Sequence, residues 1–185
     1  MKILGFTALP LVYALGCGPR YAVPPALPAS ATHVSNPTEA QRLLQTTIAT
    51  KTDLELYDEE RFLAPCDLTY ELKAGDRGDY AICAAALLDG DVEQGYIVSL
   101  NKEQTEAAHT VFASKYRGFW GVNSAADAEY RSNHFFTLPE AIADSVGRGK
   151  YASFTVYDYK GVNISKGNEN LEGKLKKVGT FRLKK

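Results

Sequence analysis

The sequence predicts an α+β fold: an antiparallel sheet of about five strands with two to three helices on one face, preceded by an extended Pro/Ala-rich N-terminal arm. Three observations support this class. Five stretches carry apolar residues in the pattern of strands, and three carry them at helical spacing. These stretches occur in groups and lack the strict strand–helix alternation of a parallel sheet. Asp89-Gly90, between two strand-like stretches, is typical of a hairpin turn.

The composition indicates one domain with a hydrophobic core, which we place at residues 36–185, after an arm or signal segment at residues 1–35. Lysine and arginine number 21 and aspartate and glutamate 22, so the net charge is −1. A charge this balanced provides no electrostatic attraction for nucleic acid or for an anionic membrane. We therefore expect protein partners and no nucleic acid.

Helix-start signals mark the helical stretches. Asn36-Pro37-Thr38-Glu39 combines an N-cap asparagine, a proline in the first turn and a glutamate that reaches back, and it predicts a helix to Thr50. Asn101 with Gln104 resembles a capping box for a helix that ends at Gly118. Thr137-Leu138-Pro139-Glu140 predicts a third helix, to Gly147. Shorter helical segments are expected at 58–64 and 124–131.

Alternation or continuous apolar character marks the strands. Leucine and tyrosine alternate with polar residues from Asp67 to Leu72, which is the period of a half-buried strand. Tyr80–Leu88 is apolar throughout and indicates a central strand covered on both sides. Further strands are expected at Tyr96–Leu100, Tyr151–Tyr159 and Val178–Lys184, with a polar loop at 161–173.

The core follows from the apolar positions that these elements turn inward. The predicted core consists of Leu43, Leu44, Ile48, Leu68, Tyr70, Ile82, Leu87, Ile97, Val111, Phe112, Ile142, Phe154, Val156 and Phe181.

The first thirty-odd residues allow three interpretations: an export signal, a retained arm and a disordered tail. Ile3–Gly16 is an apolar run that follows one basic residue, is too short to span a bilayer and ends at Cys17. If the run is an export signal, its removal would leave Cys17 at the new N-terminus as a lipidation site. Lipidation of Cys17 is the only way in which we expect the protein to be attached to a membrane. As a retained arm that keeps Met1, it would need a partner, because the prolines of Gly18–Ala31 favour extended backbone without hydrogen bonds of its own. The localisation is accordingly a large assembly or an exported state.

The other two cysteines, Cys66 and Cys83, flank the first predicted hairpin and would lie close together. They would form a disulfide in an oxidising compartment and remain buried thiols in the cytosol. A nucleophilic Cys83–His109 pair is disfavoured, because the apolar neighbours of Cys83 would raise the pKa of its thiol. No two cysteines or histidines have metal-ligand spacing, so the sequence indicates no metal and names no cofactor.

A glycine-bracketed loop is the candidate partner contact. Its residues are Tyr116, Arg117, Phe119 and Trp120, and Gly118 and Gly121 would push the only tryptophan outward. Aromatic side chains and arginine are enriched where protein interfaces bind most strongly.

The sequence contains no catalytic triad, phosphate loop or paired-carboxylate motif. We therefore expect a non-catalytic structural or assembly subunit of a multi-protein complex such as a virion, filament or antenna, anchored by its N-terminal arm. The alternatives are an exported lipoprotein-like binding domain tethered through Cys17, and a small enzyme of unidentified chemistry.

Overall fold

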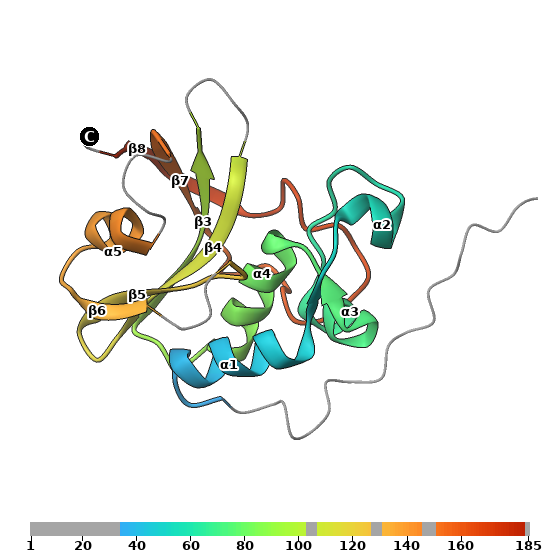
Figure 1. Cartoon of the computed structure of the whole chain (residues 1–185), viewed down its shortest axis with the longest axis horizontal. Helices are drawn as coiled ribbons and strands as arrows, with labels where there is room; N and C mark the ends of the chain where they lie inside the picture. The colour runs from blue at the N-terminus through green and yellow to red at the C-terminus, as the bar shows by residue number, and fades with distance from the viewer. Residues whose placement is uncertain (1–33, 103–106, 127–130, 146–150, 184–185) are drawn as a thin grey trace, which may run out of the picture.

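A computed structural model describes residues 34–102, 107–126, 131–145 and 151–183. Its main element is a six-stranded antiparallel sheet with the order β6-β5-β4-β3-β7-β8, shown in Figure 1. This confirms the predicted α+β class with an antiparallel sheet; the predicted arm lies outside the described residues. The strands are β3 (Gln94–Asn101), β4 (Ala107–Tyr116), β5 (Phe119–Asn123), β6 (Arg131–Phe135), β7 (Ser153–Asp158) and β8 (Lys176–Arg182).

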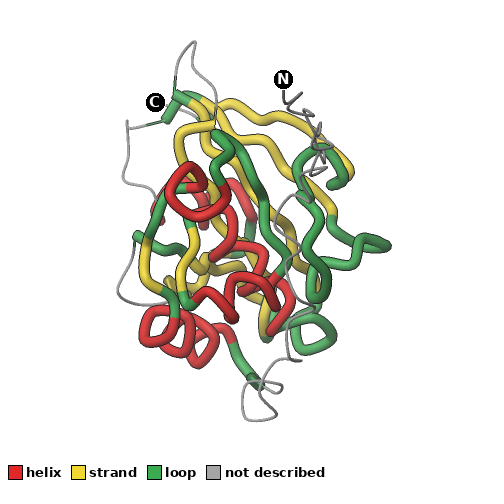
Figure 2. Tube along the Cα trace, turned by 90° about the vertical axis from the view of Figure 1, so that its right-hand side faces the viewer, coloured by secondary structure: helices red, strands yellow, loops and turns green. Residues whose placement is uncertain are grey.

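Helices cover both faces of the sheet. The helices α1 and α4 pack with α3 in one hydrophobic cluster, whereas α5 packs in a second cluster on the other face. Figure 1 shows α5 apart from the group formed by the other helices, and Figure 2 shows the helices, in red, beside the strands, in yellow, from a direction turned by 90°. None of the helices in the described ranges is long and apolar enough to cross a membrane. The remaining elements are α1 (Pro37–Thr47), β1 (Ala49–Thr50), α2 (Asp53–Tyr57), α3 (Cys66–Leu72), β2 (Ala74–Gly75), α4 (Arg77–Leu87) and α5 (Leu138–Ser145), with β1 and β2 in a small parallel pair.

Local capping signals predicted the first and last helices correctly. The Asn36 side chain accepts a hydrogen bond from the Glu39 backbone N–H at 3.0 Å, with Pro37 as the first residue of α1. Before α5, the Glu140 carboxylate accepts from the Thr137 backbone N–H at 3.2 Å and from the Thr137 hydroxyl at 2.8 Å. Such contacts satisfy backbone N–H groups that a helix start leaves without partners.

Two predicted strands are helices instead. Residues 67–72 belong to α3 and residues 80–88 to α4 and its C-terminal cap, so the predicted hairpin between them is wrong. Asp76 caps α4, and Asp79 completes a capping box with it. Nearly every residue of α4 is buried, so its apolar positions show no helical period and resemble a two-sided strand.

The opposite error occurred at residues 107–116, which were expected to be helical and form β4. This strand pairs with β3 and with β5, so side chains on both its faces are buried and the alternation that identifies a strand is lost. The shorter helix expected at 58–64 is wrong too, and the one expected at 124–131 lies partly outside the described residues, at 127–130. Asp58 ends α2 in a left-handed conformation with no helix after it, and residues 124–126 are not helical.

The other strands follow the prediction, as β3, β7 and β8, and a loop occupies 161–173. Most of the predicted core is buried, with Phe112, Phe154 and Leu44 among its largest members. Leu43 is only partly buried, and Phe181 is 44% exposed because β8 is an edge strand with an open outer side.

Candidate functional site

The β4–β5 hairpin forms the predicted contact loop, and its tip is held by contacts with Glu93. Its two turn residues, Arg117 and Gly118, have φ angles of 51° and 84°, which is the conformation of a tight two-residue hairpin turn. The Gly118 N–H donates to the Glu93 carboxylate at 2.7 Å, and the Lys115 ammonium lies 3.5 Å from the same carboxylate. The tip is therefore tied to the residue that precedes β3.

Trp120 is a core residue, and the prediction that it points outward is wrong. Its side chain is 7% exposed and stacks on Tyr96, with ring centroids 6.0 Å apart. Strand alternation explains this position, because Trp120 faces the α5 side of the sheet while Phe119 and Gly121 face the other side. The sequence reasoning took residues 115–121 for an irregular loop and so did not apply this alternation.

Three aromatic side chains form a partly exposed aromatic patch beside the tip, consisting of Tyr116, Phe119 and Phe136. Tyr116 and Phe119 are directly opposite each other in the β4–β5 pair and so share one face. Phe136 follows β6, is 76% exposed and has its ring centroid 5.4 Å from that of Phe119. The Arg117 guanidinium lies over the Tyr116 ring at 5.1 Å. Sequence reasoning missed Phe136 because it is distant in sequence from the loop.

The cysteines form no site of their own. Cys66 and Cys83 are free and buried, and the Cys83 thiol donates to the Cys66 carbonyl at 3.5 Å. The predicted disulfide is therefore not formed here, although α3 and α4 do bring the two residues together. Burial raises the pKa of the Cys83 thiol, as the sequence suggested, so it is a poor nucleophile. Cys17, the candidate lipidation site, lies outside the described residues.

Two adjoining clefts, of about 720 and 420 Å³, open where α2 meets the start of α4 and strand β4. Both are lined by Asp53, Glu60, Asp76 and Thr110. Asp53, Asp76 and Asp79 bring carboxylate oxygens within 4.8 Å of one another. Such oxygens suit a hard cation, so this is the cluster that could hold a metal within the described ranges.

Hydrogen bonds within the protein already use most of these oxygens. Asp79 is fully buried and accepts from the Ala64 N–H at 2.7 Å, the Asp76 N–H at 3.2 Å and the Tyr57 hydroxyl at 3.2 Å. One Asp76 oxygen accepts from two N–H groups of α4. The pair therefore serves to begin α4 and to attach it to the segment before α3.

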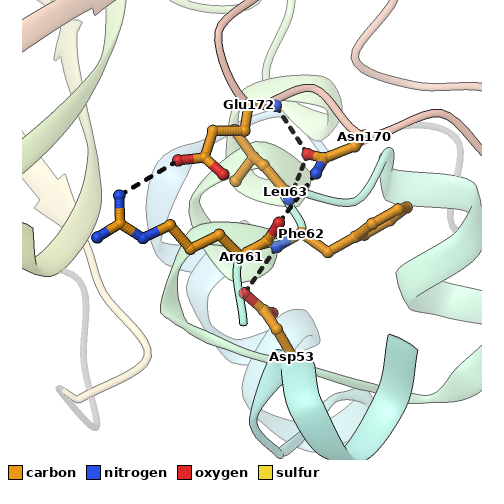
Figure 3. A network of polar contacts seen from close by, with 6 residues as sticks. All are labelled: Asp53, Arg61, Phe62, Leu63, Asn170 and Glu172. Atoms are coloured by element: carbon orange, nitrogen blue, oxygen red, sulfur yellow. Dashed lines mark hydrogen bonds and ion pairs between the residues drawn. The ribbon is translucent and has the colours of Figure 1, made fainter. Parts of the chain in front are cut away.

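Asp53 belongs to a network that fastens the C-terminal loop to the domain, drawn in Figure 3. Its Oδ2 accepts from the Phe62 N–H at 3.0 Å. The Asn170 side-chain oxygen accepts a hydrogen bond from the Leu63 N–H at 2.9 Å, and its NH₂ group donates one to the Arg61 carbonyl at 2.9 Å. Asp53 Oδ1 is buried and has no hydrogen-bond partner among the described residues. Most oxygens of the cluster are already hydrogen-bonded within the protein, whereas calcium takes six or more oxygen ligands.

The pKa values of these carboxyl groups are raised. Burial, together with the nearby Asp76 carboxylate, raises the pKa of Asp79 to about 7. Burial raises the pKa of Asp53 to about 6, against the lowering effect of its bond from Phe62. Both groups therefore hold protons more tightly in the folded protein than in the unfolded chain, where the pKa is about 4.

This difference predicts a pH dependence of stability. Because the folded state binds these protons more tightly, the free energy of unfolding should fall as the pH rises from about 4 and level off above about 7. We expect that in Asp53→Asn the free energy of unfolding decreases less as the pH rises, so that this variant is more stable than the wild type at pH 7. Urea unfolding at a series of pH values measures this. Asp144→Asn, at an exposed acid, is the control. If the free energy of unfolding changed with pH equally in Asp53→Asn and Asp144→Asn, the pH dependence would not come from Asp53.

A second polar cluster connects β4 and β5 to α1. The His109 Nε2 lies 3.0 Å from the Ser124 hydroxyl, and the Gln41 amide donates to the Ser124 carbonyl at 2.7 Å. The Asn123 amide donates to the Pro37 carbonyl at 2.9 Å. Burial, and secondarily the charge of Arg77, lowers the pKa of His109 to about 4, so the imidazole is neutral at pH 7. Ser124 is 2% exposed; its hydroxyl contacts the ring, and its backbone bonds the Gln41 side chain of α1.

No protein-family model matches the chain, and a search of curated proteins found no significant match. The interpretation therefore rests on the geometry of the two candidate sites. Most oxygens of the cleft carboxylates and the His109 Nε2 are engaged with the protein's own backbone and side chains, whereas Asp53 Oδ1 and His109 Nδ1 have no hydrogen-bond partner among the described residues. The aromatic patch, by contrast, presents apolar side chains to solvent.

Proposed function

We propose that this protein is a non-catalytic structural or assembly subunit of a larger multi-protein complex, anchored through its N-terminal arm. The observation that carries the proposal is the aromatic patch of Tyr116, Phe119 and Phe136 beside Arg117. Exposed apolar side chains contribute little to the stability of an isolated domain, whereas aromatic side chains and arginine account for much of the binding energy at interfaces.

The contacts that hold the tip support the same proposal. Ordering flexible side chains and loops on binding reduces affinity, and a contact surface that is already ordered avoids that loss. The Glu93 carboxylate holds both the Gly118 N–H and the Lys115 ammonium, and the Tyr116 ring supports the Arg117 guanidinium. A partner would thus meet a surface whose backbone and main cation are already positioned.

We expect the full chain, tagged and produced at natural levels in its own organism, to elute in size-exclusion chromatography well above its monomer mass of 20.2 kDa. Phe136→Ala should weaken the association by about 2 kcal/mol, or about 30-fold in Kd, with an unchanged melting temperature. Leu54→Ala, at a site 59% exposed on α2, is the matched control and should leave the association intact. Elution of the wild-type protein as a monomer would refute the proposal.

A further inference from the structure

The strand β8 is at one end of the six-stranded sheet, with β7 on its inner side (Figure 1). The residue that follows it, Leu183, donates its N–H to the Ala152 carbonyl at 2.9 Å. Because backbone groups alternate in direction along an antiparallel strand, Thr180 and Arg182 turn their N–H and C=O groups away from β7. Within the described ranges, no strand pairs with this outer side. The edge of β8 therefore offers backbone donors and acceptors to a further strand.

The charged side chains of β8 are all positive. Lys176, Lys177 and Arg182 are exposed, and the strand contains no acidic residue. None of the ion pairs among the described residues involves these three side chains. Lysines on an edge strand oppose pairing with a strand that brings no negative charge, because like charges directly opposite each other are destabilising. The charge of β8 therefore favours an acidic strand.

We propose that the outer edge of β8 binds an extended acidic segment of a partner protein, which pairs with β8 as an additional strand. Strand addition of this kind derives its affinity from backbone hydrogen bonds and its specificity from side chains at alternate positions. The outward backbone groups of Thr180 and Arg182 provide those hydrogen bonds. The inference goes beyond the proposed function, since the aromatic patch lies beside β5 and β6, at the other end of the strand order.

The register of β8 on β7 specifies the pattern of the partner segment. Lys177 lies directly opposite Tyr157. Arg182 lies opposite Ser153, which is four residues from Tyr157 on β7. The two cations therefore share one face of the sheet and are about 13 Å apart along the strand. Phe181, next to Arg182, is on the opposite face and is 44% exposed. A matching segment carries two carboxylates four residues apart, with apolar residues on its other face.

The edge strands of a second copy do not provide such a segment. Pairing β8 with β8 would place lysine and arginine side chains against one another. The strand β6, at the other end of the sheet, has the sequence RSNHF, so it also lacks a carboxylate. The charges of both edges thus disfavour edge-to-edge pairing between copies, and we expect a different protein on β8.

Titration of the isotope-labelled full chain with two synthetic peptides, followed by NMR, tests the proposal. The acidic peptide is Thr-Glu-Val-Thr-Val-Glu-Thr, and the basic peptide has lysine in place of both glutamates. We expect the acidic peptide to bind at least about tenfold more tightly than the basic one, and less tightly as salt is added. At about ten times its Kd, it should slow hydrogen exchange of the Thr180 and Arg182 N–H groups about tenfold, because only the unbound edge exchanges.

Charge reversal on β8 makes the test independent of the domain's stability. Lys177→Glu/Arg182→Glu should reverse the preference, so that the basic peptide binds more tightly. Its melting temperature should be unchanged, because both side chains are exposed. The matched control is Lys51→Glu/Lys160→Glu, which changes the net charge equally at exposed residues outside β8 and should keep the wild-type preference.

Several results would overturn the proposal: no binding of the acidic peptide, equal binding of both peptides, slowed exchange only outside β8, or a preference that Lys177→Glu/Arg182→Glu leaves unchanged. Exchange at Thr180 and Arg182 that slows as the protein alone is concentrated would overturn it too, because it would place a second copy on β8. Monomeric elution from native extract refutes the proposed function but leaves peptide binding unchanged, so the two failures can be distinguished.

Discussion

Phe112→Ala is expected to lower the free energy of unfolding by about 3–5 kcal/mol. The Phe112 side chain is fully buried between the sheet and the α1/α4 layer, and its ring meets the edge of Tyr159 at 6.1 Å. A Cβ placed on Gly95 would approach the ring to 2.8 Å, so the surroundings are closely packed around this side chain. Truncation would leave a cavity that rigid neighbours cannot fill.

Urea unfolding followed by circular dichroism measures this loss. Phe136→Ala is the matched control, because the same truncation at a residue 76% exposed should cost less than about 0.5 kcal/mol. A loss below roughly 1 kcal/mol for Phe112→Ala would mean that the face of β4 assigned to the core is wrong.

Trp120→Ala is expected to reduce stability by a similar amount, about 3–5 kcal/mol. The indole lies in the second hydrophobic cluster, beneath α5, and stacks on Tyr96. Because the side chain is buried, the substitution should affect partner binding only through the loss of folded protein. Phe119→Ala, at the adjacent residue on the opposite face, should give the reverse pattern of weaker association and little loss of stability.

Chemical unfolding of both variants, together with their native elution volumes, separates the two outcomes. Trp120→Phe is a useful intermediate, because it retains an aromatic ring in the same site and should lose less stability than Trp120→Ala. A Trp120→Ala protein with unchanged stability and weakened association would restore the contact role that the sequence suggested and contradict the burial of the indole.

Signals that act over three or four residues were readable from the sequence. Asn36 with Pro37 and Glu39, and Thr137 with Glu140, begin helices through side chains that bond nearby backbone, so they predict α1 and α5 directly. The strands β3 and β7 were recognised from their apolar stretches. The antiparallel α+β class followed from the order of these elements.

Elements buried on both sides could be identified only in the tertiary structure. Both α4 and β4 are apolar around nearly their whole surface, which removes the periodicity that distinguishes a helix from a strand. The two were therefore exchanged in the prediction. Packing decides such segments, because α4 must cover the sheet while β4 must pair with β3 and β5 within it.

The candidate contact surface shows the same division between local and tertiary information. The glycine-bracketed loop and its aromatic residues were visible in the sequence. Which of Phe119 and Trp120 faces solvent was not. Pairing of β5 with β4 turns Phe119 toward the patch and Trp120 into the core. Phe136 joins the patch from beyond β6 because the strands bring it beside Phe119. Contacts between residues distant in sequence depend on strand register, which no local pattern specifies.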